Sequence, residues 1–293
     1  MELITGENDK GRRLDRILRK ALPNHPLSLL HRLFRQGKIL VNGKKAKAQD
    51  RLESGAVINI PLPDEARSEK PKRPCTMPSL DIIWDGTGLL AVNKPCGLEI
   101  HGENSLDVMV GSFLAGKLPP SLSFKSGPLH RLDKATSGIV VFSTSIEGAR
   151  LFTSLLRERK VRKTYLALLE GCLEKEEIWQ DELVRDIERK ITTVVQSPRE
   201  DSKSAYTKIK PVMENKNYTL AEIEIGTGRT HQIRAQAGAH GHPLCGDRKY
   251  GSGSPGGFFL HAWKLEFLEY YIEAPLPAAF RERIRAVFGT VGS

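Results

Sequence analysis

The chain has 293 residues, 39% of them hydrophobic, and a formal net charge of +10 at pH 7. This length can bury a sizeable core without disulfides or a structural metal, and we expect two domains. The four cysteines form no Cys-x-x-Cys pair, which argues against a zinc knuckle or a disulfide framework and favours a reducing compartment.

At the N-terminus, the first seven residues lack the basic start and the apolar run of an export signal. No apolar stretch further along approaches the length of a membrane-spanning helix. We therefore expect a soluble, cytoplasmic protein that has no membrane partner.

The excess positive charge is concentrated near the N-terminus. Residues 1–62 carry thirteen Lys and Arg against six Asp and Glu, a net charge of +7. The total charge alone would fit nucleic acid, acidic lipid or simple solubility, so its distribution carries the argument. Such crowding on a small domain is typical of a module that binds phosphates.

Two short helices and a small sheet are predicted in this basic segment. Apolar residues at helical spacing predict one helix over 13–22 and a second between Ser28 and Gly37. The run 38–41 leads into Asn42-Gly43, which favours a type I′ hairpin turn, and residues 56–60 supply another strand.

This order of elements, with the motifs Arg13-Leu14-Asp15-Arg16-Ile17-Leu18, Arg35-Gln36-Gly37-Lys38-Ile39-Leu40-Val41-Asn42-Gly43 and Leu52-Glu53-Ser54-Gly55-Ala56-Val57-Ile58, resembles an S4 RNA-binding domain over residues 12–60. In that family the second helix and the basic loop after it face RNA. The alternative is a solvated basic face without a partner. The resemblance implies RNA binding by Arg32, Arg35, Lys38, Lys44, Lys45 and Lys47.

The next segment is rich in proline and mixed charge, so it is predicted to be an extended linker. We divide the chain into an RNA-binding domain over 1–62, a linker over 63–79 and a second domain over 80–293. In the second domain, strand-like apolar runs such as 139–142 and 218–225 alternate with fewer helical segments. An α+β fold is therefore expected.

One turn of the second domain is a candidate site of chemistry. Asp133 follows Arg131 by two positions, in a turn that runs through Thr136-Ser137-Gly138 into an apolar strand. A lone Asp could cap the turn, pair with a neighbouring arginine, or act as nucleophile or base. Two observations favour function: a glycine at 138 permits close approach of a ligand backbone, and a cation-rich segment, 226–234, follows another predicted strand.

Five sequence blocks, in this order, resemble the RluA-type RNA pseudouridine synthases: Leu90–Leu98 with His101, His130–Gly138, Arg162–Ala167, Gly228–Arg234 and Gly241–Gly251. A sixth, weaker block is Leu260-His261-Ala262-Trp263, and together the blocks span about residues 89–263 of this chain. The resemblance implies an enzyme that breaks the C1′–N1 bond of uridine, turns the uracil and joins C5 to C1′. It also implies a catalytic domain with a mixed, largely antiparallel sheet flanked by helices.

The resemblance assigns roles to four residues. Asp133 would be the essential carboxylate, Arg234 would pair with it, and Tyr165 would pack against the target base and help remove a proton late in the reaction. Arg131 would enter the gap left by an extruded nucleotide, since a stacked uridine exposes neither C1′ nor C5. A flat guanidinium can stack there. Asp133 must be ionised, either as nucleophile at C1′ or as base at the 2′ carbon; both remain open.

No redox change or external reactant is involved, so the resemblance implies no cofactor. The histidines at 231, 240 and 242 lack the spacing of a ligand set, so no metal is expected. Large-subunit rRNA is favoured over tRNA as the partner, because family members with an S4 domain mostly act on it, and we expect a monomer. The alternatives are a non-catalytic RNA-binding or ribosome-assembly factor, or a pseudouridine synthase that acts on tRNA rather than rRNA. A glycoside hydrolase would need a second positioned acid.

Two departures from the family pattern stand out. Ala235-Gln236-Ala237 follows Arg234 where the family usually has Val-His-Leu, and these small residues could loosen the packing behind Arg234. The family's His-Pro after the strand that ends at Phe267 is also missing. Neither change touches Asp133 or Tyr165, so we expect activity but leave the substrate uridine open.

Overall fold

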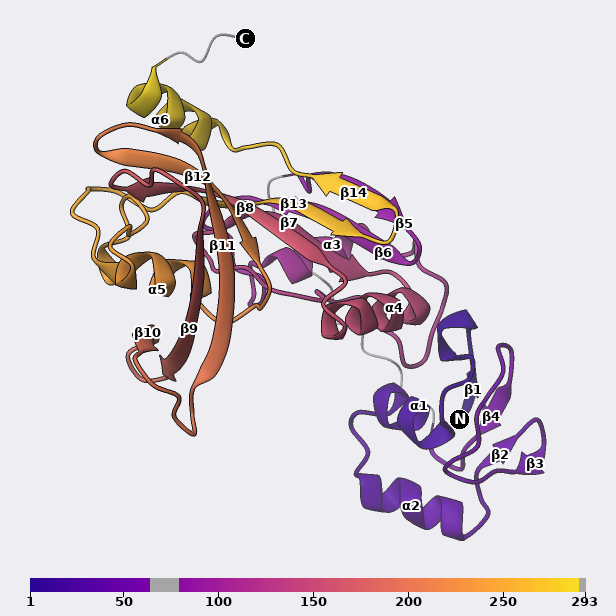
Figure 1. Ribbon diagram of the computed structural model, residues 1–293. Coiled ribbons are helices and arrows are strands. Elements are labelled where there is room, and N and C mark those ends of the chain that lie inside the picture. The colour runs from indigo at the N-terminus through magenta and orange to yellow at the C-terminus, as the bar shows by residue number, and fades with distance from the viewer. Residues whose placement is uncertain (64–78, 290–293) are drawn as a thin grey trace.

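The computed structural model describes residues 1–63 and 79–289, which form two units (Figure 1). All but the end residues of the predicted linker, 63–79, lie outside the described residues, as does Cys75. Within the described ranges, none of the helices is long and apolar enough to cross a membrane.

The N-terminal unit has the predicted two helices and a small antiparallel sheet with the strand order β1-β4-β2-β3. Asn42 and Gly43 both have positive φ angles, 47° and 75°, as the predicted hairpin turn requires. The second helix starts at Leu27, slightly before the predicted Ser28, and the chain leaves it through Gly37 at φ 62°. The elements are β1 (Glu2–Ile4), η1 (Glu7–Asp9), α1 (Leu14–Ala21), α2 (Leu27–Arg35), β2 (Leu40–Val41), β3 (Lys44–Lys45) and β4 (Val57–Asn59).

The second unit is built on a ten-stranded sheet with the order β10-β9-β11-β12-β8-β13-β7-β6-β5, and β14 pairs with β13. Among the strands of residues 79–289, only β13 and β7 pair in parallel, so the predicted mixed, largely antiparallel sheet is confirmed. The strands are β5 (Ile82–Gly86), β6 (Leu89–Lys94), β7 (Ser137–Ser143), β8 (Arg162–Glu170), β9 (Glu177–Asp186), β10 (Ile191–Val195), β11 (Lys203–Glu214), β12 (Tyr218–Ile225), β13 (Leu260–Phe267) and β14 (Tyr270–Glu273). The helices are α3 (Leu106–Phe113), α4 (Ile146–Arg157), α5 (Gln232–Ala239), η2 (Arg248–Tyr250) and α6 (Ala278–Phe288).

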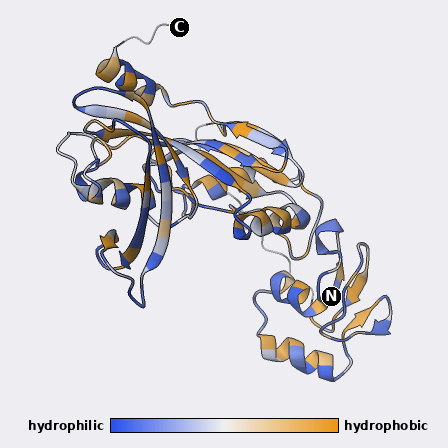
Figure 2. Cartoon of the chain, viewed as in Figure 1, coloured by the Kyte–Doolittle hydropathy of each residue, from blue (hydrophilic) through white to orange (hydrophobic). Residues whose placement is uncertain are grey.

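The centre of this sheet is apolar on both faces. Every residue of β7 is buried, because one cluster of side chains packs on one face and a second cluster, with Phe152 of α4, packs on the other. Figure 2 shows hydrophobic residues along the central strands and hydrophilic residues toward the projecting ends of β9 and β11. The candidate site therefore rests on the most deeply buried part of the sheet.

Gly138 is required by the parallel pairing of β7 with β13. Its φ is 108°, and a Cβ atom there would lie 2.2 Å from the carbonyl oxygen of Ala262. The glycine thus allows the backbone of β13, not a ligand backbone, to approach, which corrects the interpretation from the sequence. The close contact fixes where the turn that carries Asp133 enters the sheet.

The two units are joined by a buried carboxylate. Asp9 has no solvent exposure and accepts hydrogen bonds from Ser121 Oγ at 2.8 Å, from Leu122 N at 2.8 Å and from Ser123 N at 3.1 Å. Burial alone would raise the pKa of Asp9, but the hydrogen bonds from Ser123, the amides of Gly6 and Leu122, and Ser121 together lower it. Asn8 adds a contact, because its Oδ1 accepts from the amide of Ile146 at 2.9 Å.

Candidate active site

Three sequence blocks that are far apart in the chain line one cavity of about 350 Å³. The turn 130–136, strand β8 and the segment 228–234 contribute most of its wall. Asp133, Tyr165, Arg234 and Arg131, the four candidate residues from the sequence, all line it. The structure thus brings together the residues that the sequence singled out.

Lys94, at the end of β6, holds the turn that carries Asp133. Its side chain is fully buried, and Nζ donates to the carbonyl oxygens of Pro95 at 3.0 Å, Leu98 at 2.8 Å and Lys134 at 3.0 Å. Burial lowers the pKa of Lys94 to about 8, so it is still an ammonium at pH 7 and can donate to all three carbonyls. The backbone directly after Asp133 is fixed by this clamp, a role that the sequence interpretation gave only as a rigid turn.

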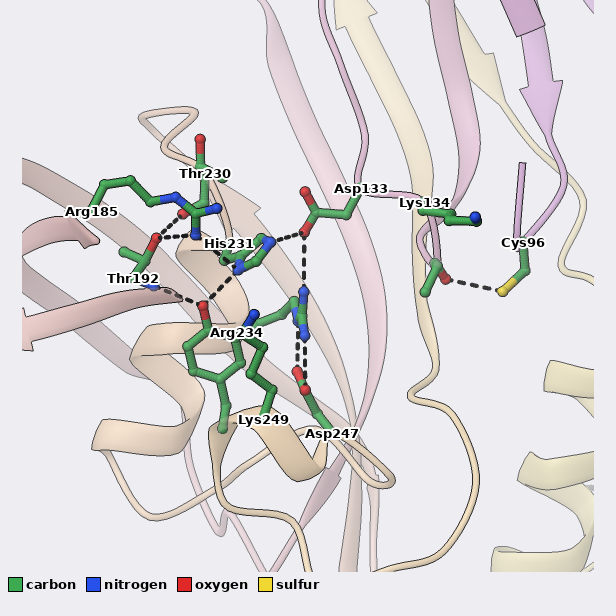
Figure 3. Close-up of polar contacts among 12 residues, drawn as sticks. Cys96, Asp133, Lys134, Arg185, Thr192, Thr230, His231, Arg234, Asp247 and Lys249 are labelled. Atoms are coloured by element: carbon green, nitrogen blue, oxygen red, sulfur yellow. Dashed lines mark hydrogen bonds and ion pairs between the residues drawn. The ribbon is translucent and has the colours of Figure 1, made fainter. Parts of the chain in front are cut away.

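Arg234 lies between two carboxylates (Figure 3). Its Nε and Nη2 donate to Asp247 at 2.6 Å and 2.9 Å, a two-pronged contact, whereas its Nη1 lies 3.5 Å from Asp133 Oδ2. The side chains of Arg234 and Asp247 are 9% and 2% exposed. The expected pairing of Arg234 with Asp133 is therefore present but long, and Asp247 is the partner that fixes the guanidinium.

His231 faces Asp133 from the other side. It is the N-cap of α5 in a left-handed conformation, and its Nε2 lies 3.7 Å from Asp133 Oδ2. Its Nδ1 lies 2.6 Å from the hydroxyl of Tyr250, which also accepts from the amide of Thr192. Burial lowers the pKa of His231, and the charges of Arg234, Arg185 and Lys249 lower it further against the pull of Asp133. A neutral imidazole at pH 7 follows.

Tyr165 and Lys163 project from β8 into the cavity. Tyr165 is 7% exposed, and burial, followed by the charge of Asp133, raises the pKa of its hydroxyl. Burial lowers the pKa of Lys163. An uncharged ring thus forms one wall of the cavity.

Arg131 and His130 differ in role although they are neighbours. Arg131 is exposed at the mouth of the cavity. His130 Nε2 accepts from the amide of Val141 at 3.1 Å, and burial, together with Lys163, lowers its pKa to about 3. With this lone pair occupied, His130 braces the turn against β7 and is not available as a base through Nε2.

The three residues after Arg234 pack tightly. Ala235, Gln236 and Ala237 are all buried on α5. Gln236 accepts from Thr207 at 2.6 Å and donates to Asp181 Oδ2 at 2.6 Å. The expected loosening behind Arg234 is therefore not seen, because a buried amide bonded to β9 and β11 replaces apolar packing.

Asp247, Tyr250 and Lys163 were missed as site residues. Each lies inside one of the quoted sequence blocks. Nothing in the sequence distinguishes that carboxylate, hydroxyl or ammonium group from the others in the same block. The six cations expected to face RNA in the N-terminal unit are all exposed: Arg32, Arg35, Lys38, Lys44, Lys45 and Lys47.

Comparison with protein families gives two matches. Residues 88–239 match the RNA pseudouridylate synthase family, and residues 12–58 match the S4 domain. The first match covers more than half of the chain and includes the turn of Asp133, Tyr165 and Arg234.

Curated proteins and solved structures give the same picture. The chain is 30% identical to "Ribosomal large subunit pseudouridine synthase C" of Vibrio cholerae, over 95% of this chain and 94% of that protein. It is 31% identical to "Ribosomal large subunit pseudouridine synthase D" of Neisseria meningitidis, over 83% of this chain and 64% of that protein. The structure of "Human RNA Pseudouridylate Synthase Domain Containing 4" superposes with a TM-score of 0.60 at 22% identity, covering 70% of this chain and 92% of that one, and shows the shared fold.

Proposed function

The chain belongs to the RNA pseudouridylate synthase family, and on that premise we propose that the cavity around Asp133 isomerises specific uridines of large-subunit rRNA to pseudouridine. The observation that carries the proposal is one carboxylate, 21% exposed, at the wall of a cavity that also holds Tyr165 and Arg234. The relatives named as large-subunit synthases support the choice of RNA.

Asp133 is proposed to be the essential carboxylate. Arg234 Nη1 approaches one of its oxygens, yet at 3.5 Å the contact leaves the oxygen lone pairs accessible to a bound ribose. Because Asp247 takes the two shorter bonds of Arg234, the guanidinium does not collapse onto Asp133. The carboxylate can then act as nucleophile at C1′ or as base toward the 2′ proton, and the geometry is compatible with both.

Tyr165 is proposed to pack against the uracil and then to help remove a proton. Its hydroxyl pKa is raised first by burial and second by the negative charge of Asp133. In the covalent route, C5 displaces Asp133 from C1′, so the carboxylate is free again when the C5 proton must leave. The neutral hydroxyl of Tyr165 can then relay that proton, because its oxygen accepts the proton from C5 while its own proton passes to Asp133 or to solvent.

Arg131 is proposed to fill the space of the extruded uridine. It is exposed beside the cavity, and a planar guanidinium can stack between the neighbouring bases. The six exposed cations of the N-terminal unit are proposed to hold flanking RNA through its phosphates. We place the RNA-binding domain at 1–62, the linker at 63–79 and the catalytic domain at 80–293.

We also propose that the protein acts as a monomer in the cytoplasm. Asp133, Tyr165 and Arg234 of the same chain meet in one cavity, so the proposed reaction needs no residue from a second copy. Cys96, Cys172 and Cys245 are free thiols, as a reducing compartment would leave them. Sedimentation at micromolar concentration under reducing conditions should give one species of about 33 kDa, the mass of one chain of 32.6 kDa.

The test is a map of pseudouridines in total RNA from cells that have or lack this protein. We expect one or a few pseudouridines of large-subunit rRNA to disappear with the protein and to return when it is restored. Loss of a tRNA pseudouridine alone would refute the rRNA assignment. Identical maps would refute the proposed activity.

A further inference from the structure

A second cavity lies where the two units meet. Its volume is about 430 Å³, within the range of ligand-sized clefts, which is roughly 300–1,000 Å³. We call it the arginine cavity. In the described chain its lining holds no carboxylate; the N-terminal unit supplies four arginines and α4 supplies one, and the lining residues are Arg12, Arg13, Arg16, Arg51, Ile146 and Arg150.

Three of these arginines are already held in place. Arg13 makes a two-pronged contact with Asp15, at 3.2 Å and 2.7 Å. Arg12 donates to Ser123 Oγ of the second unit at 2.7 Å, and Arg51 donates to the carbonyl oxygen of Gly11 at 2.6 Å. The guanidinium groups are thus oriented by the protein before any ligand binds.

The remaining two, Arg16 and Arg150, are exposed and come from different units. Across residues 1–63 and 79–289, neither has a carboxylate at ion-pair distance. Burial lowers the pKa of Arg12, the charge of Asp9 raises it, and the charges of Arg150 and Arg16 lower it, as expected where positive charges repel one another. An anion in the cavity would relieve that repulsion.

The guanidinium groups, not the helix ends, would supply the donors. Both α1 and α4 begin at the arginine cavity, but their first amides already have acceptors: Leu14 N donates to Asp50 and Ile146 N donates to Asn8. A planar guanidinium matches two oxygens of a phosphate at once. The cavity therefore suits a phosphate group that several arginines contact together.

We propose that the arginine cavity binds a backbone phosphodiester of the RNA substrate and so clamps one RNA strand between the two units. The inference rests on the proposed function for the identity of that RNA. Helix α4 links the two cavities: Arg150 lines the arginine cavity and Leu156 lines the cavity of Asp133. The two residues are six positions apart on the helix, about 9 Å along its axis, so RNA held here lies within reach of the active site.

The arginine cavity lies apart from the six cations proposed to bind RNA, which lie on α2, on β3 and next to the β2–β3 hairpin. Figure 1 shows α1 on the side of the N-terminal unit that faces α4, with α2 beyond it. The arginine cavity would therefore guide the strand between the basic face and the cavity of Asp133. This proposal also gives the buried Asp9 contact a function, because RNA can be held between the two units only if their relative position is fixed.

The test compares Arg16→Gln/Arg150→Gln with a matched control, Arg19→Gln/Arg285→Gln. The control removes one exposed arginine from each unit and the same total charge, but neither residue lines the arginine cavity. The probe is an unmodified large-subunit rRNA transcript, with affinity measured from low to high salt. We expect the cavity variant to lose roughly tenfold in affinity and to show a slope of log affinity against log salt that is shallower by about 0.7 to 0.9.

The control should keep both the affinity and the slope within error of the unmodified protein. The single variants Arg16→Gln and Arg150→Gln complete a double-mutant cycle. Because both contact one phosphate, the loss in the double variant should be smaller than the product of the two single losses. A loss equal to that product, or a cavity variant with an unchanged slope, would overturn the proposal.

Pseudouridine formation is followed in the same samples. The RNA concentration that gives a half-maximal rate should rise by the same factor as the dissociation constant. If the unmodified protein forms no pseudouridine while the cavity variant still shows the shallower slope, the proposed function fails and the phosphate site stands. If pseudouridine forms and the two slopes agree, only the phosphate site fails.

Discussion

Replacement of Asp247 by Asn should destabilise the catalytic domain strongly, because it leaves the buried Arg234 without its main partner. The contact is two-pronged at 2.6 Å and 2.9 Å, between side chains that are 9% and 2% exposed. Removal of one partner of a buried pair costs roughly 3–5 kcal/mol. Since Asp133 remains 3.5 Å from Arg234, we expect about 3 kcal/mol, the lower end of that range.

The assay is urea and thermal unfolding of Asp247→Asn beside the unmodified protein. For a domain of this size, each kcal/mol shifts the melting temperature by roughly 2–4 °C, so a decrease of about 6–12 °C is expected. The matched control is Asp186→Asn, whose ion pair with Arg189 is 3.8 Å long and largely exposed, and it should stay within about 0.5 kcal/mol. Asp247→Asn with a stability equal to that of the control would refute the role of Asp247.

Three further predictions concern the base, the RNA and the contact between units. Tyr165→Phe keeps the ring but loses the hydroxyl, so RNA affinity should stay within a few-fold of the unmodified protein while turnover falls. A wild-type rate would show that Tyr165 only packs against the base. The second variant changes Arg32, Arg35 and Lys38 to Ala, and its RNA binding is titrated with salt. The slope of log affinity against log salt should become shallower by about 0.7 to 0.9 for each phosphate that the protein no longer binds. An unchanged slope would disprove RNA binding by these three residues. The lowered pKa of Asp9 means that its stabilisation is present above the unfolded value of about 3.9 and is lost as the pH falls through the lower folded value. Amide exchange at Leu122 and Ser123 should therefore rise in that acid range, and Asp9→Asn should abolish the step; exchange with the same pH dependence in both proteins would contradict this.

Elements set by local patterns could be predicted from the sequence. The helical spacing around α1 and the Asn42-Gly43 turn depend on neighbouring residues, and both are confirmed. The apolar runs of β7 and β12 were also recognised, and β12 has the predicted bounds, Tyr218–Ile225. Such runs are easy to recognise in a sequence because a buried strand contains few polar residues.

The rest depends on contacts between distant residues. Strands β9, β10 and β11 project from the sheet with many polar side chains, so they carry no continuous apolar run and were not predicted. The parallel pairing of Ser137 with His261 joins residues 124 positions apart. The glycine at 138 was noticed, but only the structure shows that it meets β13.

The candidate site shows the same division. Its main members were available as motif residues, and the structure brings them into one cavity. Which residues pair with one another could not be predicted. The sequence offers several carboxylates as partners for Arg234, and only the fold places Asp247 close to its guanidinium and Asp133 farther away. The left-handed backbone of His231, which turns its ring toward Asp133, has no sequence signature either.

The central claim is that Asp133 carries out the isomerisation, and single-turnover conversion of a large-subunit rRNA transcript by Asp133→Asn tests it most directly. The substitution keeps the shape of the side chain and removes only its charge. We expect RNA binding within a few-fold of the unmodified protein and no detectable pseudouridine at saturating enzyme. Appreciable pseudouridine formation by the purified variant would contradict the account.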